Sequence, residues 1–263
     1  MMPMSAAAYL NSNATACVAN SFSNGQLVNQ YTALCAPNLL DKCSGITAIS
    51  RDDKAIIIAF GGTANFIQLV TESQESIFGN KTQFIAGGNV SEYFFNAWKG
   101  LWNSGMQDDL LTARNGNPGY QLWVTGHSLG GSMASLAAAY VIKLGLFTSS
   151  QVTLYTFGQP RTGDTNYAAA HDQLLGSASW RVTHHQDPVP HLPTEDYEGY
   201  FHHKSEIWYN NNMTVGSSYA ECDADEGSSC SDSNLLDLSI SDHLHYFNKE
   251  VHQFGECGCG PSC

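Results

Sequence analysis

Ser128 lies in the pattern Gly-His-Ser-Leu-Gly at residues 126–130, a spacing in which a serine hydroxyl acts as a nucleophile. A run of β-branched and aromatic residues, 120–125, precedes the pattern, and a run of small residues, 132–145, follows it. This order predicts a strand, a sharp turn that exposes Ser128, and a helix whose free N–H groups point at the reacting centre. The flanking glycines let strand and helix approach closely. The alternative is a serine that only caps a helix.

A serine nucleophile needs a base to take its proton, and the base needs a carboxylate to orient it. In the α/β-hydrolase arrangement the chain presents the serine, then the acid, then the histidine. Asp187 fits the acid, because it lies just after the predicted strand 180–185 and precedes two prolines within 188–190 that cannot continue a sheet. The alternative for Asp187 is an ordinary turn residue before proline. Asp164, which follows another predicted strand, is the rival acid.

His243 is the predicted base. It lies where a polar segment meets an aromatic one near the end of the chain, and a loop there can reach back over the sheet edge. His245, two residues further on, is its nearest competitor. The other histidines that follow the acid are His191, His202, His203 and His252. We expect His202 and His203, which precede an apparent strand, to face solvent or the sheet.

The elements that would position these residues alternate along the chain. Residues 45–50 and 55–60 flank a turn signal and predict a hairpin. Further strands are predicted at 152–157, 180–185 and 205–209, and helices at 5–40, 91–114 and 164–175. Such alternation indicates a largely parallel sheet with helices on both faces. Without repeats or a linker, we expect one domain over residues 1–263, with residues 1–16 poorly ordered.

The composition is that of an ordinary globular protein with an acidic surface. Hydrophobic residues make up 43% of the chain, and no apolar run approaches the roughly 20 residues that a membrane span needs. The net charge of −13 disfavours nucleic acids and anionic membranes as partners. Only 13% of residues are charged, so we expect a surface rich in neutral polar side chains.

The cysteines indicate disulfides. The chain has eight of them, an even number clustered towards its two ends, without the paired spacing of a zinc site. Disulfides in an oxidising compartment explain them best, and Cys35 and Cys43 are close enough to pair with each other. Sequons for N-glycosylation, which suit a secreted protein, begin at Asn13, Asn80, Asn89 and Asn212. We therefore predict a secreted glycoprotein.

Five motifs in chain order resemble the class 3 lipases, the fungal-type triacylglycerol lipase family of the α/β hydrolases. They occupy residues 60–63, 124–131, 156–164, 181–190 and 242–247. The details rich in histidine and cysteine are similar to secreted nematode members. The resemblance implies an α/β-hydrolase fold with a central, mostly parallel sheet, held by disulfides at both chain ends. It assigns Ser128 as nucleophile, Asp187 as acid and His243 as base, and it gives Asp164 a structural role.

The resemblance also implies an oxyanion hole. Its donors would be the backbone N–H and hydroxyl of Thr63 and the backbone N–H of Leu129, typically contributing about 3 kcal/mol per donor to the transition state. A family disulfide matches the pair Cys222 and Cys230. We further expect Cys17 to pair with a C-terminal cysteine and clamp the ends of the domain.

The chain departs from the family pattern beside Thr63. Gly61 stands where the family usually has arginine, and the segment 64–72, which corresponds to the family's lid helix, is shorter by about one helical turn. We assign Phe66 and Ile67 to an acyl groove, with His127 as a further substrate contact; ordinary core packing is the alternative. A short lid predicts weak interfacial activation. A sharp rise in rate at the solubility limit of a triglyceride would contradict it.

Together these observations predict a secreted lipase. It would hydrolyse carboxylic esters of acylglycerols through an acyl-enzyme on Ser128, with no cofactor or metal. Its partner would be a lipid or ester substrate at a lipid–water interface, and we expect a monomer. A phospholipase A1, a galactolipase or a soluble carboxylesterase would use the same machinery. The non-enzymatic alternative is a secreted binding protein on an inactive hydrolase scaffold.

Overall fold

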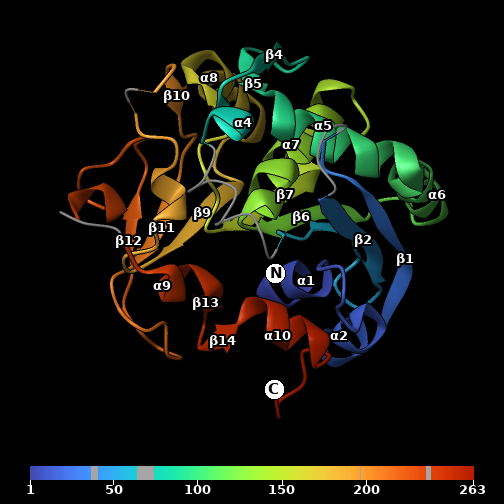
Figure 1. Ribbon diagram of the computed structural model, residues 1–263. Helices are drawn as coiled ribbons and strands as arrows, with labels where there is room; N and C mark the ends of the chain where they lie inside the picture. Colours follow the sequence, from blue (N-terminus) through green and yellow to red (C-terminus); the bar gives the residue numbers. More distant parts are fainter. Residues whose placement is uncertain (37–40, 64–73, 196, 235–237) are drawn as a thin grey trace.

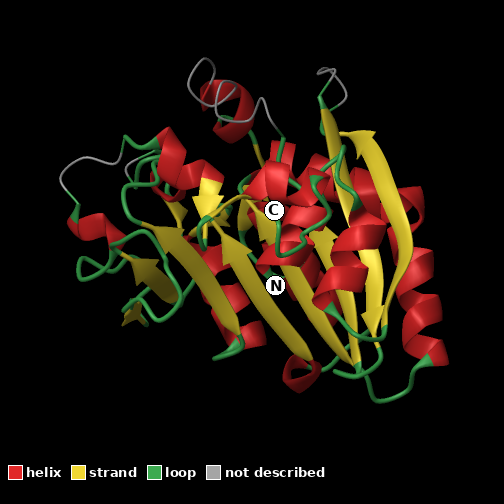
Figure 2. Cartoon of the chain, turned by 90° about the horizontal axis from the view of Figure 1, so that it is seen from below, coloured by secondary structure: helices red, strands yellow, loops and turns green. Residues whose placement is uncertain are grey.

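The computed structural model describes residues 1–36, 41–63, 74–195, 197–234 and 238–263. Eight strands form the central sheet, shown from two sides in Figures 1 and 2. In spatial order they are β1 (Gly25–Leu34), β2 (Lys42–Ser50), β3 (Ala55–Phe60), β6 (Gln121–His127), β7 (Val152–Phe157), β9 (Ser179–His184), β11 (Glu206–Tyr209) and β12 (Ala220–Cys222). The strands from β3 to β11 run parallel, and the others pair antiparallel at the two edges. The expected mostly parallel sheet is confirmed.

Helices cover both faces of the sheet (Figure 2). One face packs against α5 (Glu92–Leu101), α6 (Gln107–Gly116), α7 (Leu129–Lys143) and α8 (Thr165–Leu175); the other packs against α1 (Met2–Ala7), α2 (Ala14–Ser21) and α10 (Val251–Glu256). Alternate side chains of β3 enter the two cores: Ile56 and Ile58 point to the first, and Ile57 to the second. A strand buried on both faces therefore reads as a continuous apolar run.

Smaller elements fill the loops. A second sheet consists of β4 (Lys81–Gln83), β5 (Asn89–Ser91), β8 (Gly163–Asp164) and β10 (Tyr200–Phe201). Separately, β13 (His245–Tyr246) and β14 (Lys249–Glu250) form a two-stranded hairpin. The short helices are α4 (Gln74–Phe78) and α9 (Ile240–Leu244). Single turns lie at Ser149–Gln151, Val189–His191 and Ser231–Ser233.

The N-terminal segment differs from the predicted helical layer. Helices α1 and α2 are present, but residues 25–34 form the edge strand β1, which pairs with β2. Residues 1–16 were expected to be poorly ordered, whereas α1 buries Met4 completely and the Ser5 hydroxyl lies 2.9 Å from that of Thr125 in β6. Both differences arise from contacts with the distant sheet, which local sequence patterns do not encode.

The predicted long helix at 91–114 is interrupted. A π-helical turn, Trp102–Met106, separates α5 from α6, and Gly105 within it has a φ of 121°. Only glycine adopts that conformation readily. The apolar face continues across the turn, with Trp98, Trp102 and Met106 all fully buried, which explains why the periodicity suggested a single helix.

Four disulfides use all eight cysteines. Cys35–Cys43 and Cys222–Cys230 form as expected, and Cys17 pairs with Cys259, a C-terminal cysteine. The remaining pair is Cys257–Cys263. Both chain ends lie on the same side of the molecule, where α1, α2 and α10 meet (Figure 1), so the Cys17–Cys259 bridge joins neighbouring elements that are remote in sequence.

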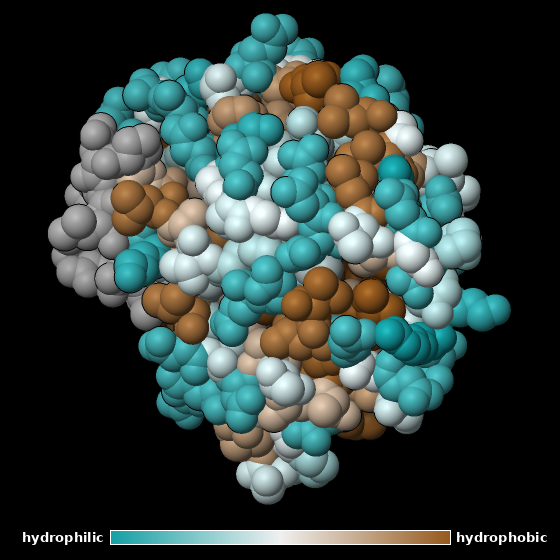
Figure 3. Space-filling model, turned by 90° about the vertical axis from the view of Figure 1, so that its right-hand side faces the viewer, coloured by the Kyte–Doolittle hydropathy of each residue, from teal (hydrophilic) through white to brown (hydrophobic). Residues whose placement is uncertain are grey.

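On the face shown in Figure 3, groups of apolar residues are separated by hydrophilic ones. Within the described ranges, no helix has the length and apolar character needed to cross a membrane.

Candidate active site

The turn between β6 and α7 has the strained geometry that the glycine pattern predicted. Ser128 has φ 61° and ψ −131°, a conformation that few non-glycine residues adopt. A Cβ on Gly126 would lie 2.0 Å from the carbonyl oxygen of Gly130, and one on Gly130 would lie 2.1 Å from that of Phe60. Only glycine therefore lets α7 leave so close to β6 and β3.

The structure brings the three predicted catalytic residues together. His243 Nε2 lies 2.9 Å from Ser128 Oγ, and His243 Nδ1 lies 2.9 Å and 3.0 Å from the two carboxylate oxygens of Asp187. All three side chains are buried. They come from the turn after β6, the loop after β9 and helix α9. This geometry suits a hydroxyl that passes its proton to an imidazole held by a carboxylate.

Backbone contacts hold α9 against the loop that carries Asp187. The Ser239 N–H donates to the carbonyl of Gln186, and the Gln186 N–H donates to the carboxylate of Asp242. His185 Nδ1 lies 3.0 Å from the same carboxylate. His243 and Asp187, 56 residues apart in sequence, are thus fixed at hydrogen-bonding distance.

Asp187 is held as a carboxylate although it is buried. Burial alone would raise its pKa, but His243, the Tyr246 hydroxyl and the Val189 N–H together bring the pKa below the ordinary value. Tyr246 donates at 2.7 Å to one oxygen, and Val189 donates at 2.9 Å to the other. The charge that should stabilise a protonated His243 is therefore present at neutral pH.

His127 contacts His243 through its ring and through one ring nitrogen. Its Nε2 lies 2.8 Å from the carbonyl oxygen of His243, its Nδ1 lies 2.6 Å from the Tyr9 hydroxyl, and its ring stacks on that of His243. Burial, with His243 nearby, lowers the pKa of His127 to about 3. Although His127 borders the cavity beside Ser128, both nitrogens have protein partners. These partners fit a positioning role, and the substrate contact expected of His127 stays a prediction.

Of the two residues expected to donate to an oxyanion, Thr63 borders the cavity beside Ser128. A cavity of about 230 Å³ is bordered by Ser128, His243 and Thr63. The Thr63 Oγ1 is buried without a hydrogen-bond partner in the described structure, and Leu129 begins α7, where N–H groups have no partner within the helix. The proposed acyl-groove residues Phe66 and Ile67, with the rest of the lid segment 64–72, lie outside the described residues.

Packing accounts for Gly61, the departure from the family pattern. A Cβ at this position would lie 2.5 Å from the carbonyl oxygen of Ala8, the residue that ends α1. The space that a side chain would need is therefore filled by the N-terminal helix. On the next residue, Gly62, a Cβ would lie 2.6 Å from the Tyr9 hydroxyl.

The rival residues have other roles. Asp164 caps α8 by accepting from the Tyr167 N–H at 2.9 Å, as the family resemblance implied. His245, the first residue of β13, has its Nδ1 2.8 Å from the carbonyl oxygen of Ser241 in the preceding helix α9. His202 and His203, expected at the solvent or the sheet, are both buried.

Three residues beside the triad were not singled out from the sequence for these roles. Gly158, with φ 58°, leaves space for the triad, since a Cβ there would lie 2.8 Å from an Asp187 oxygen and 3.0 Å from the His243 ring. Tyr246 and Tyr9 supply the hydroxyls described above. The family motif includes Gly158 and Tyr246, but their roles depend on contacts across more than 20 residues of sequence.

The chain is similar to known lipases in both sequence and structure. The family model for class 3 lipases matches residues 57–197. The chain belongs to the class 3 lipase family. A lipase from Caenorhabditis elegans is 34% identical over 100% of this chain and 81% of its own length. A secreted mono- and diacylglycerol lipase from Fusarium solani is 33% identical over 84% of this chain and 65% of its own.

The fold of this class 3 lipase is also similar to that of solved structures. The triacylglyceride lipase of Rhizomucor miehei superposes with a TM-score of 0.82 and 26% identity, covering 95% of this chain and 93% of that one. The chain spans a smaller part of some curated fungal relatives, such as 55% of the Rhizopus niveus lipase. The similarity to the Rhizomucor miehei structure identifies the central sheet and its flanking helices as an α/β-hydrolase fold.

Proposed function

We propose that this class 3 lipase hydrolyses carboxylic esters of acylglycerols through an acyl-enzyme on Ser128. The observation that carries the proposal is the chain of contacts from Ser128 Oγ through His243 to Asp187, each at 2.9 Å. The substrate class is supported by relatives named as mono- and diacylglycerol lipases and by the fold of a triacylglyceride lipase.

In the first half of the reaction, Ser128 Oγ attacks the ester carbonyl carbon while His243 Nε2 takes the hydroxyl proton. The carbonyl oxygen becomes an oxyanion, which the Thr63 hydroxyl and the N–H groups of Thr63 and Leu129 stabilise. His243 then gives its proton to the leaving alcohol oxygen, and the C–O bond breaks. The acyl group remains on Ser128.

In the second half, water attacks the acyl carbonyl while His243 again takes the proton. The second oxyanion collapses, Ser128 Oγ recovers its proton from His243, and the fatty acid leaves. Asp187 stays charged throughout and stabilises the imidazolium that forms twice per turnover.

Covalent labelling tests this assignment. A fluorophosphonate should label the wild-type protein on Ser128, and Ser128→Ala should lose both labelling and ester hydrolysis without losing its fold by circular dichroism. A folded wild-type protein that is neither labelled nor active would support the inactive-scaffold alternative. Activity retained by Ser128→Ala would exclude the mechanism.

The substrate class is tested separately with emulsified mono-, di- and triacylglycerols beside a phosphatidylcholine, a galactolipid and p-nitrophenyl esters. We expect the highest kcat/KM on an acylglycerol. A higher value on the phospholipid, on the galactolipid or on the short soluble esters would replace acylglycerols with that class while leaving the Ser128 mechanism intact.

We also propose that the protein is a secreted, monomeric glycoprotein. Four disulfides and a relative named as secreted support export. Asn80 and Asn212 are exposed, whereas the Asn89 amide donates to Asp164 and Asn13 caps α2. We expect glycans at Asn80 and Asn212. When the protein is expressed in eukaryotic cells, glycosidase treatment of the medium should lower its mass. Light scattering of the purified protein should give the molar mass of one chain.

A further inference from the structure

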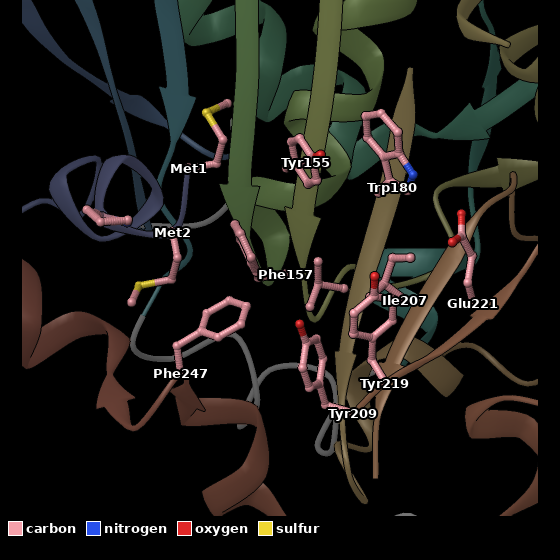
Figure 4. A pocket seen from close by; sticks show the side chains of 12 residues that line it. Met1, Met2, Tyr155, Phe157, Trp180, Ile207, Tyr209, Tyr219, Glu221 and Phe247 are labelled. Atoms are coloured by element: carbon pink, nitrogen blue, oxygen red, sulfur yellow. The ribbon is translucent and has the colours of Figure 1, made fainter. Parts of the chain in front are cut away.

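A second cavity lies on the sheet face opposite α7, between α1 and the edge strands. Its volume is about 840 Å³, much larger than the cavity at Ser128, and no residue lines both. Its floor consists of outward-facing side chains from β7, β9 and β11, while Met1, Met2 and Phe247 close one end (Figure 4). We call this cavity the aromatic groove.

Six aromatic residues line this groove, and four of them, from separate segments, form two ring pairs. Tyr155 and Trp180, neighbours across β7 and β9, stack with ring centres 4.7 Å apart. Tyr209 on β11 lies 5.4 Å from Tyr219, measured between ring centres. Tyr219 is 57% exposed, so burial in the core does not account for it. Contiguous apolar area exposed to solvent commonly marks a binding surface. The exposed ring of Tyr219 and the half-buried rings beside it form such an area.

One charged side chain lines the groove, and it is negative. The α-amino group of Met1, which also lines the groove, is buried, and burial lowers its pKa. Glu221, exposed on β12, is the neighbour of Ile207 in the groove floor. None of the described lining residues has a basic side chain. Burial raises the pKa of Tyr155, and Glu221 and Tyr219 add to this effect, so its phenol stays uncharged and presents a neutral π face. The groove thus combines electron-rich rings with a single carboxylate.

These properties select the class of ligand. A carboxylate such as a free fatty acid would be repelled by Glu221, and a hydrated ammonium with several donors would leave them unpaired against aromatic walls. A quaternary ammonium has a diffuse positive charge and no N–H to satisfy, and rings with a nearby carboxylate attract it. We propose that the aromatic groove is an accessory binding site for a quaternary ammonium group of the choline type.

Calorimetric titration of the full chain with choline chloride at constant ionic strength tests the site. The reference ligand is 3,3-dimethylbutan-1-ol, which has the shape of choline without its charge. We expect saturable binding of choline, about tenfold tighter than binding of the neutral compound. Equal or tighter binding of the neutral compound, or no saturable choline signal, would overturn the proposal.

Two variants probe the groove without touching the residues at Ser128. Glu221→Gln and Tyr219→Ala should each weaken choline binding by about three- to tenfold, while hydrolysis of a p-nitrophenyl ester stays at the wild-type rate. Asp108→Asn, which removes an exposed charge on α6, is the matched control and should leave binding unchanged. Wild-type choline affinity in both groove variants would contradict the assignment.

Phosphatidylcholine vesicles then separate two sources of the same chemistry. Vesicle binding that choline displaces would identify the ligand as a lipid headgroup, whereas choline binding without vesicle binding would identify a soluble choline compound. Either result supports the site. Vesicle binding that choline cannot displace, with no saturable choline signal, would assign the groove to lipid acyl chains and overturn the proposal.

Discussion

At the scale of single residues, the candidate site depends on a glycine that leaves space for the catalytic side chains as well as on the polar side chains that contact them. Gly158 has no side chain where Asp187 and His243 meet, and Tyr246 fills the remaining acceptor position of Asp187. Neither residue would carry out chemistry itself. Both decide whether the imidazole and carboxylate can meet in the geometry that proton transfer requires.

Gly158→Ala should reduce ester hydrolysis by at least about a hundredfold. The new methyl group would press on Asp187 and His243, and a displacement near 1 Å at reacting groups typically costs that much. Gly176 has almost the same φ, 57°, but open space around it, so Gly176→Ala is the control. It should lose about 1–2 kcal/mol of stability through backbone strain and keep its activity. Equal activities in the two variants would refute the steric role.

Tyr246→Phe removes one donor to Asp187, so kcat should fall about tenfold with little change in KM. It should also change the pH dependence of stability. The folded-state pKa of Asp187 lies below the ordinary 3.8, so its contribution is present above pH 3.8 and is lost as the pH falls through the folded value. Without Tyr246 the pKa rises, and stability should be lost at a higher pH.

The measurement for Tyr246→Phe is urea unfolding between pH 6 and pH 3. Tyr197→Phe is a matched control, because that hydroxyl contacts only Glu75 at the surface among the described hydrogen bonds. If both variants follow the wild-type pH profile, Tyr246 does not set the pKa of Asp187.

At the scale of elements, the end of α1 fills the space beside Gly61, two residues before Thr63, the proposed oxyanion donor. Tyr9, just beyond α1, reaches His127. The N-terminal segment therefore contacts both Gly61 and the nucleophile elbow, the turn at residues 126–130 that carries Ser128. In the family pattern an arginine stands at position 61, and the two arrangements exclude each other sterically.

Gly61→Arg should consequently destabilise the protein by about 1–3 kcal/mol, because α1 must move away from the sheet. Activity should fall with it, since Thr63 is two residues away. Gly116→Arg, at a helix end with open space, is the control and should be neutral within about 0.5 kcal/mol. A Gly61→Arg protein as stable as that control would mean that α1 does not depend on Gly61.

At the scale of the whole molecule, the disulfides differ in what they constrain. Cys17–Cys259 spans 242 residues and joins α2 to the segment after α10, whereas Cys35–Cys43 closes a loop of 8. Chain-entropy estimates give about 5 kcal/mol for the first and about 2.5 kcal/mol for the second. The long bridge should thus contribute most to keeping both ends packed on the sheet.

The paired replacements Cys17→Ser with Cys259→Ser should lower the free energy of unfolding more than Cys35→Ser with Cys43→Ser. Guanidinium unfolding of both double variants beside the wild type measures this order. The reverse order would show that strain or residual structure in the unfolded chain, rather than loop length, sets the contribution of each bridge.

The sequence by itself determined the main strands and helices around Ser128 and their order. The elbow pattern, the apolar runs of the strands and the prolines after Asp187 are local signals, because each depends on the backbone preferences of adjacent residues. They were sufficient to place β3, β6, β7, β9, β11, α7 and α8, and the predicted Ser128, Asp187 and His243 lie together in the fold. The disulfide Cys35–Cys43 is similarly local.

Only the tertiary structure decided what distant segments do to one another. Residues 25–34 became a strand because β2 offered a free edge, and α1 is ordered because the sheet buries it. Gly61, Gly158 and His127 acquired their roles from atoms that are 30 to 120 residues away in sequence. The aromatic groove likewise exists only where three strands and the chain segment before β12 meet. Such contacts depend on packing in space, which the spacing of residues along the chain does not specify.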